Sequence, residues 1–286
     1  MLTLQTSNTT NMRLLVVLMV VLTAFSANSQ KNAFAPNGKG NFYVFWGWNR
    51  ANYTKSTIHF TGDSYDFTLH NVVARDRQSP FSTRLYLNPA NITIPQTDLR
   101  LGYYIKDKWQ VSFGVDHMKY VMVSDQHVQM MGRIANSGTD YDGVYPKQDF
   151  QIKRDFLLFE HTDGLNYLNL ELRRSDVLWG SKHVWLSAQY GAGLGALMPK
   201  TNATLLNNAR HDAFHLAGYG LAAVGAVNIN FYKYFFIQGE LKGGFIHMPD
   251  IRTTEYKADR ASQKFAFAEY IVSFGVNVPL GEFKKD

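Results

Sequence analysis

Four residues of this sequence could support acid–base chemistry. A histidine can accept a proton near neutral pH, and a carboxylate can orient it while a hydroxyl attacks. The catalytic candidates are Glu160, His161, Asp163 and His117, with Ser124 or Thr162 as the nucleophile. A catalytic triad is an arrangement in space, and residues one or two apart in sequence rarely form one. We therefore expect a protein without catalytic activity and keep an enzyme as the alternative.

Two histidines, His211 and His215, have the spacing of a zinc-binding pair. That spacing places two ligands together on a helix. On a strand, residues four apart lie roughly 13 Å apart, which is too far to share one ion. We predict no metal site and no cofactor.

Charged side chains of both signs recur at alternate positions in several segments. Eight of them form a predicted charge network: Asp98, Arg100, Asp116, Glu171, Arg173, Glu240, Lys242 and Glu269. Inside a narrow barrel such groups would meet and neutralise one another away from water. Because side chains just fill the interior of an eight-stranded barrel, we interpret the network as filling the lumen. A gated pore or a proton path is the alternative.

The segments that carry these charges have the two-residue period of a β-strand. Leucines occupy positions 168, 170 and 172, and Asn169, Glu171 and Arg173 lie between and after them. Clear alternation also marks 97–105, 109–123, 235–247 and 268–278, and weaker strand signals mark 41–53, 184–198 and 214–231. One apolar and one ionic face is typical of a strand between lipid and a polar lumen. A soluble β-sandwich or lipocalin-like barrel is less favoured, because it would bury the ionic face.

The connections between these segments predict the topology. The links 106–108, 174–183 and 231–234 are short, whereas 54–91, 124–163, 199–213 and 248–264 are long. Outer-membrane barrels have short periplasmic turns and long external loops, and these links alternate in that way. We predict an antiparallel up-and-down barrel of eight strands. Ile58–Phe60 and Tyr65–Leu69 could add two strands to the wall, and a barrel of ten strands would still have both chain ends on the same side. We interpret this pair as a hairpin within the first external loop.

The start of the chain has the pattern of a secretory signal peptide. Met12 and Arg13 precede an apolar run from Leu14 to Phe25, which is too short to span a membrane as a helix. We predict a signal peptide over 1–30 with cleavage between 26 and 30, a periplasmic segment over 31–40, a transmembrane barrel over 41–280 and a periplasmic tail over 281–286. The chain has 16 Tyr, 20 Phe and no Cys, so an exported disulfide scaffold is excluded. Aromatic residues near predicted strand ends, Tyr120, Tyr167 and Trp185 among them, suggest interfacial girdles.

The strand count, the alternation of links, the charged lumen face and the aromatic rim resemble those of the OmpA/OmpX-like small outer-membrane barrels. The resemblance covers residues 41–278. The phrases at 45–50, 116–120 and 160–164 look like those of uncharacterised barrels in Bacteroidetes-type bacteria. The resemblance implies a location in the outer membrane of a Gram-negative cell and no settled activity. One departure is that Phe283 is followed by three further residues, where that family ends on an aromatic.

These observations favour a non-catalytic outer-membrane barrel with a structural, adhesive or envelope-integrity role. The alternatives are a lipid A- or phospholipid-modifying enzyme with its site at the external rim, and a narrow channel. We expect outer-membrane lipids, lipopolysaccharide and the barrel-assembly machinery as partners, and we expect a monomer. The net charge of +6 would suit an anionic lipid surface, and an exported barrel has no access to nucleic acid.

Overall fold

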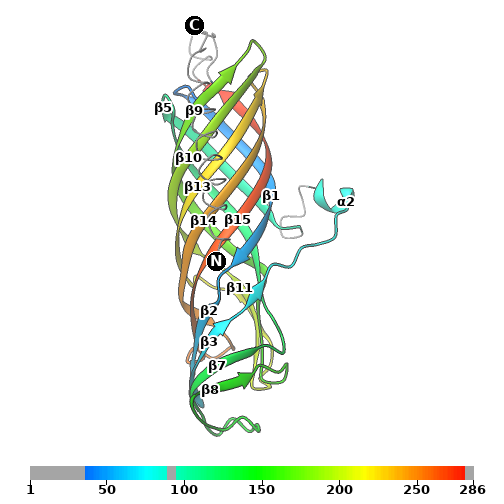
Figure 1. The fold of residues 1–286 in the computed structure, drawn as a ribbon, viewed down its shortest axis with the longest axis vertical. Coiled ribbons are helices and arrows are strands. Elements are labelled where there is room, and N and C mark those ends of the chain that lie inside the picture. Colours follow the sequence, from blue (N-terminus) through cyan, green and yellow to red (C-terminus); the bar gives the residue numbers. More distant parts are fainter. Residues whose placement is uncertain (1–35, 89–94, 281–286) are drawn as a thin grey trace, which may run out of the picture.

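The computed structural model describes residues 36–88 and 95–280, so the predicted signal peptide and C-terminal tail lie outside the described residues. Eight antiparallel strands form a closed ring, because each pairs with the next and the last, β15, pairs with the first, β1 (Figure 1). In ring order they are β1 (Asn41–Tyr53), β5 (Thr97–Lys106), β6 (Trp109–Met122), β9 (Leu157–Gly180), β10 (Val184–Leu197), β13 (Gly218–Phe231), β14 (Phe235–Arg252) and β15 (Arg260–Pro279). The predicted eight-stranded up-and-down barrel is confirmed.

Period-two alternation forms the wall of this barrel. On β14, Ile237 and Leu241 are exposed on the outer face, whereas Glu240 and Lys242 are buried in the lumen. In neighbouring strands, inward residues lie beside inward residues and outward residues beside outward ones. The β14–β15 register places Lys242 opposite Glu269 and Leu241 opposite Tyr270. Within the described residues, no helix is long and apolar enough to span a membrane.

The short connections lie at one end of the barrel. Lys108 in the β5–β6 turn and Tyr232 in the β13–β14 turn both have positive φ, at 69° and 54°. The predicted link 174–183 is wrong, because β9 continues to Gly180 and leaves only residues 181–183 as a turn. A bulge opposite Leu186 and Ser187 shifts the register near Val177, and the exposed positions then change from even to odd numbers. A bulge breaks strict alternation in this way and hides the end of a strand from a period-two pattern.

The long connections build a second structure at the opposite end, which we call the extension. It contains β2 (Ser56–Gly62), β3 (Tyr65–Val72), β4 (Ala74–Arg75), β7 (His127–Ile134), β8 (Gly143–Gln151), β11 (Lys200–Leu205) and β12 (His211–Phe214). Strands β2, β3, β7 and β8 continue the sheet from β15 and project beyond the ring at the bottom of Figure 1. The short helix α2 (Thr83–Tyr86) stands away from the barrel wall in the same view. The predicted hairpin is confirmed as β2 and β3, while the strands inside 124–163 and 199–213 were not predicted.

The inward face of the barrel strands changes character along their length. On β6, Ser112 and Asp116 are buried towards the short-turn end, and Met118, Tyr120 and Met122 are buried towards the extension. The extension and these strand ends share one large apolar core, in which the Phe60 and Phe67 rings stack with centroids 5.1 Å apart. Half of the molecule therefore has a polar interior, and the other half has the apolar interior of a water-soluble protein.

Candidate functional site

The eight residues of the predicted charge network lie together in the polar half of the lumen, each at most 4% exposed. We call them the lumen network. Arg100 contacts Asp116 at 3.2 Å and Glu171 at 3.0 Å. Lys242 lies 2.5 Å from Asp116 and 3.0 Å from the same Glu171. These contacts join β5, β6, β9 and β14 across the inside of the barrel.

A second part of the lumen network centres on Arg173. Its two terminal nitrogens donate to both oxygens of Glu240, at 2.7 and 3.0 Å, and it also contacts Glu171. Such paired hydrogen bonds are stronger and more directional than single ones. Because every cation of the network has at least two acidic partners, the arrangement holds the strands in register.

The lumen network has more acids than bases. Five carboxylates face three cations, and one oxygen of Asp98 and both oxygens of Glu269 have no hydrogen-bond partner within the described residues. Carboxylate oxygens of Asp98, Asp116 and Glu269 lie within 4.8 Å of one another, a spacing that could hold a metal ion. An ionised carboxylate without a partner in such a site is costly, by several kcal/mol or more. Glu269 is therefore the least stabilised member of the network.

Apolar side chains close the lumen on both sides of the network. Towards the short turns, Tyr43, Phe45, Tyr104 and Phe236 form an aromatic cluster. The cavity beside this cluster measures about 10 Å³, which is at the lower limit for a single water molecule. On the other side lies the apolar core of the extension. This packing disfavours diffusion of solutes through the barrel.

The four catalytic candidates have separate surroundings. His161 is fully buried, with Nδ1 2.9 Å from Thr201 Oγ1 and Nε2 3.4 Å from Gln263 Oε1. Glu160 pairs with Arg77 at 3.1 Å, because the next residue along a strand points to the opposite face. Asp163 pairs with Lys200 at 2.9 Å. The fourth candidate is His117, whose Nδ1 lies 2.7 Å from Asn166 Oδ1.

The electrostatics of His161 also disfavour a role as a base. The residue lies near the start of β9, where that strand pairs with β11 of the extension. Burial lowers the pKa of its imidazole to about 4, although the contact with Gln263 opposes this effect. The ring is therefore neutral at pH 7, has no access to solvent and packs edge-on against Phe159. We interpret His161 as a core residue at the end of β9 that packs against the extension.

Sequence reasoning missed polar residues that hydrogen-bond to the lumen network, Asn169 and Asn49 among them. Asn169 accepts from Arg100 at 2.8 Å and donates to Asp116 at 2.9 Å. Asn49 donates to Asp98 at 3.1 Å. The alternation of β9 could have identified Asn169, because it lies two residues before Glu171 and so on the same face. Asn49 was harder to predict, because the aromatic residues at 42–48 hide the polar face of β1.

The outer face of the polar half is covered by exposed apolar side chains, which we call the belt. On the clearest strands its members are Leu99, Leu101, Val111, Phe113, Leu170, Leu172, Leu194, Leu221, Val227, Ile229, Ile237, Leu241, Val272 and Phe274, each more than a third exposed. Soluble monomers rarely expose a continuous apolar surface of this extent. Tyr120, Tyr167 and Trp185 are buried inside the barrel, so the prediction that they join an interfacial girdle is wrong.

No family model matches this sequence, and no curated protein matches it. Solved structures with a similar arrangement include the attachment invasion locus protein Ail of Yersinia pestis, in complex with the heparin analogue sucrose octasulfate, at 9% identity and a TM-score of 0.31. The alignment covers 84% of this chain and 99% of that one. The outer membrane protein OprG of Pseudomonas aeruginosa matches at 10% identity and a TM-score of 0.42, over 86% and 99% of the two chains. Neisserial surface protein A matches at 11% identity and a TM-score of 0.33, over 81% and 98%. These values are too low to support an argument about function.

Proposed function

We propose that the protein is a non-catalytic outer-membrane β-barrel that stabilises the cell envelope and presents the extension outside the cell. The observation that carries this proposal is the reversal of faces along the barrel. The half surrounded by the belt has ionic groups inside, and the half that continues into the extension has an apolar core. An ionic interior with an apolar outer face is the arrangement of a barrel surrounded by lipid. An apolar core is the arrangement of a structure surrounded by water.

The orientation follows from the two ends of the barrel. Outer-membrane barrels keep short turns in the periplasm and long segments outside the cell. The turns at 107–108, 181–183 and 232–234 would then be periplasmic, and the extension would be external. The predicted signal peptide over 1–30 would direct export, and the assembly machinery would insert the chain as an OmpA/OmpX-like monomer in contact with lipids and lipopolysaccharide.

The extension is suited to binding a surface or a partner. Its four-stranded part, β2, β3, β7 and β8, rests on an apolar core and is not a set of separate loops. Val144 at its edge strand is 75% exposed, and residues 145–149 of the same strand are mostly polar. A rigid scaffold that presents variable edges is a common way to position binding residues. We therefore favour adhesion or envelope contact over transport or catalysis.

Expression in a Gram-negative host provides the test. We expect the protein in the outer-membrane fraction, with a folded form that migrates faster on a gel before boiling than after it. We also expect an unchanged lipid A acyl pattern by mass spectrometry and no conductance in planar bilayers. A changed acyl pattern would favour the enzyme, steady conductance would favour the channel, and recovery as a folded soluble protein would refute the barrel in the membrane.

A further inference from the structure

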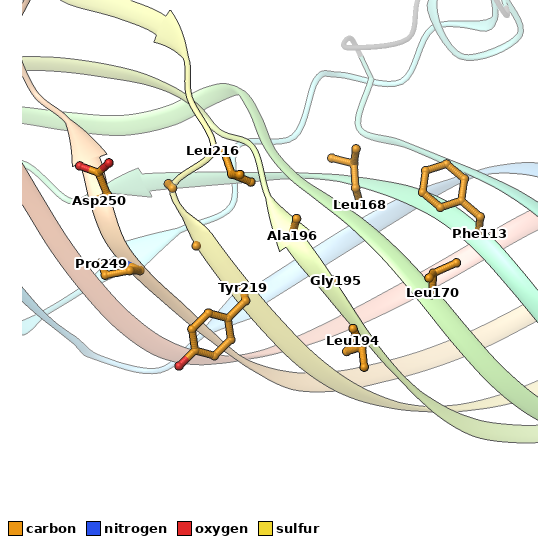
Figure 2. A pocket seen from close by; sticks show the side chains of 12 residues that line it. Phe113, Leu168, Leu170, Leu194, Gly195, Ala196, Leu216, Tyr219, Pro249 and Asp250 are labelled. Carbon is orange, nitrogen blue, oxygen red and sulfur yellow. The ribbon is translucent and has the colours of Figure 1, made fainter.

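The belt contains a groove on the outside of the barrel, where it meets the extension. This groove has a volume of about 680 Å³ and crosses β9, β10, β13 and the start of the β14 bulge. Figure 2 shows Pro249 and Asp250 at one end of the lined region and Phe113 and Leu170 at the other, with Ala196 and Leu194 between them. Volumes of roughly 300–1,000 Å³ are typical of sites that hold one small molecule.

The groove exists because a small residue lies among large ones. Ala196 is paired with Leu168 of β9 on one side and with Tyr219 of β13 on the other. Its methyl group leaves a depression between the two larger side chains. Leu216, 62% exposed, borders the depression from the segment that enters β13. Backbone hydrogen bonds fix that segment, from Ala217 N to Leu197 O at 2.9 Å and from Asp250 N to Ala217 O at 3.2 Å.

The end of the groove at Asp250 is polar. One carboxylate oxygen lies 2.8 Å from Nε2 of His215, and the other lies 3.5 Å from Arg260. That second oxygen, Oδ1, is buried, whereas the Asp250 side chain as a whole is 33% exposed. Nearby, the Tyr219 hydroxyl lies 3.2 Å from Nδ1 of His247. The apolar groove thus ends at a partly exposed carboxylate, whose oxygens have more lone pairs than the contacts with His215 and Arg260 occupy.

We propose that this groove binds one acyl chain of an outer-leaflet glycolipid, whose sugar hydroxyl or amide N–H donates to Asp250. The inference rests on the proposed membrane location. The groove is continuous with the belt, and a lipid-facing surface is covered by the acyl chains of lipids. The carboxylate at the polar end selects a donor and repels a phosphate placed directly on it. A second copy of the chain would need a contact of about 800 Å² on each partner, which a single concave groove does not provide.

Native mass spectrometry of the purified protein in detergent tests this site. The two probes are monophosphoryl lipid A, which offers hydroxyl and amide donors, and a phosphatidylcholine of similar chain length, which offers none. We expect the wild type to bind one lipid A molecule and to bind the phosphatidylcholine at least about tenfold more weakly, a factor that corresponds to about 1.4 kcal/mol.

Three variants locate the binding. Ala196→Leu fills the groove and should lower lipid A affinity about tenfold or more. Asp250→Ala removes the acceptor oxygens and should lower the affinity while leaving the groove open. The control is Ala192→Leu, which adds the same bulk to an exposed, lipid-facing position of the same strand outside the groove. The gel shift on boiling shows that each variant has folded, so loss of the shift in the wild type would refute the barrel itself. Folded variants that bind lipid A as tightly as the wild type would overturn the groove alone, and equal binding of both lipids would overturn the role of Asp250.

Discussion

Two substitutions in the lumen network should change stability in opposite directions. Lys242 is 2% exposed and lies within 4 Å of Asp116, Glu171 and Glu240. Its replacement in Lys242→Met leaves five carboxylates facing two cations. Removal of one partner from a buried ion pair typically costs about 3–5 kcal/mol, because the remaining charge has lost its compensation. We expect the free energy of unfolding to fall by that amount at pH 7.

Glu269→Gln removes a carboxylate whose two oxygens have no hydrogen-bond partner within the described residues. The side chain keeps its shape, and the network moves closer to neutrality. We expect unfolding to become more costly by about 1–3 kcal/mol, because a neutral amide costs less to bury than an ionised carboxylate. The two effects have opposite signs although both residues are buried in the same lumen.

The assay is equilibrium unfolding in urea of protein folded into lipid vesicles, followed by tryptophan fluorescence and by the gel shift on boiling. Lys108→Met is the control, because Lys108 is 53% exposed and pairs with Asp176 at 3.2 Å in a turn. A surface pair of this kind contributes about 0–1 kcal/mol. The reasoning is refuted if Lys242→Met costs no more than Lys108→Met, or if Glu269→Gln destabilises the barrel as much as Lys242→Met.

Two further predictions concern the extension and the end of β9 that packs against it. Because burial lowers the pKa of His161 to about 4 from its usual 6.5, the stability that a neutral His161 contributes is present above pH 6.5 and is lost as the pH falls towards 4, by about 3 kcal/mol in total. Stability measured across this range should decline less in His161→Gln than in the wild type, and equal declines would contradict this assignment. Phe60→Ala removes a fully buried ring that stacks on Phe67, and we expect a local loss of about 3–5 kcal/mol. Limited proteolysis should then cleave within 54–75 while the barrel keeps its gel shift, and unchanged protease resistance would count against a cooperative core in the extension.

The sequence predicts the ring well because each barrel strand in the belt has an exposed apolar face and an inward face that is polar or ionic. These two faces produce strict alternation at 97–105, 235–247 and 268–278, and the same positions form β5, β14 and β15. Alternation also selects the lumen network, since all eight of its residues have the inward parity. The strands and the lumen network can be predicted from local sequence, because successive side chains of a strand point to opposite faces of the sheet.

Features that depend on pairing between distant segments could not be predicted in this way. The bulge near Val177 is visible only from the register of β9 with β10. Strand β8 is mostly polar, and β11 and β12 have only six and four residues, so their sequences contain little strand signal. The groove requires Leu168, Ala196 and Tyr219 to be adjacent, which only the register of three strands establishes. Three of the catalytic candidates, Glu160, His161 and Asp163, are close in sequence, but their side chains have different partners.

The central claim is that the belt contacts acyl chains while the extension lies in water. The sequence has no cysteine, so a single one can be introduced and spin-labelled at any position. We would measure the collision rates of the label with oxygen and with a water-soluble nickel complex, in lipid vesicles. The labelled positions are Leu241→Cys and Val272→Cys in the belt and Lys264→Cys on the part of β15 that pairs with β2 of the extension. The account predicts that labels at Leu241 and Val272 meet oxygen and exclude nickel, and that a label at Lys264 does the reverse. A label at Leu241 that is freely accessible to nickel would contradict it.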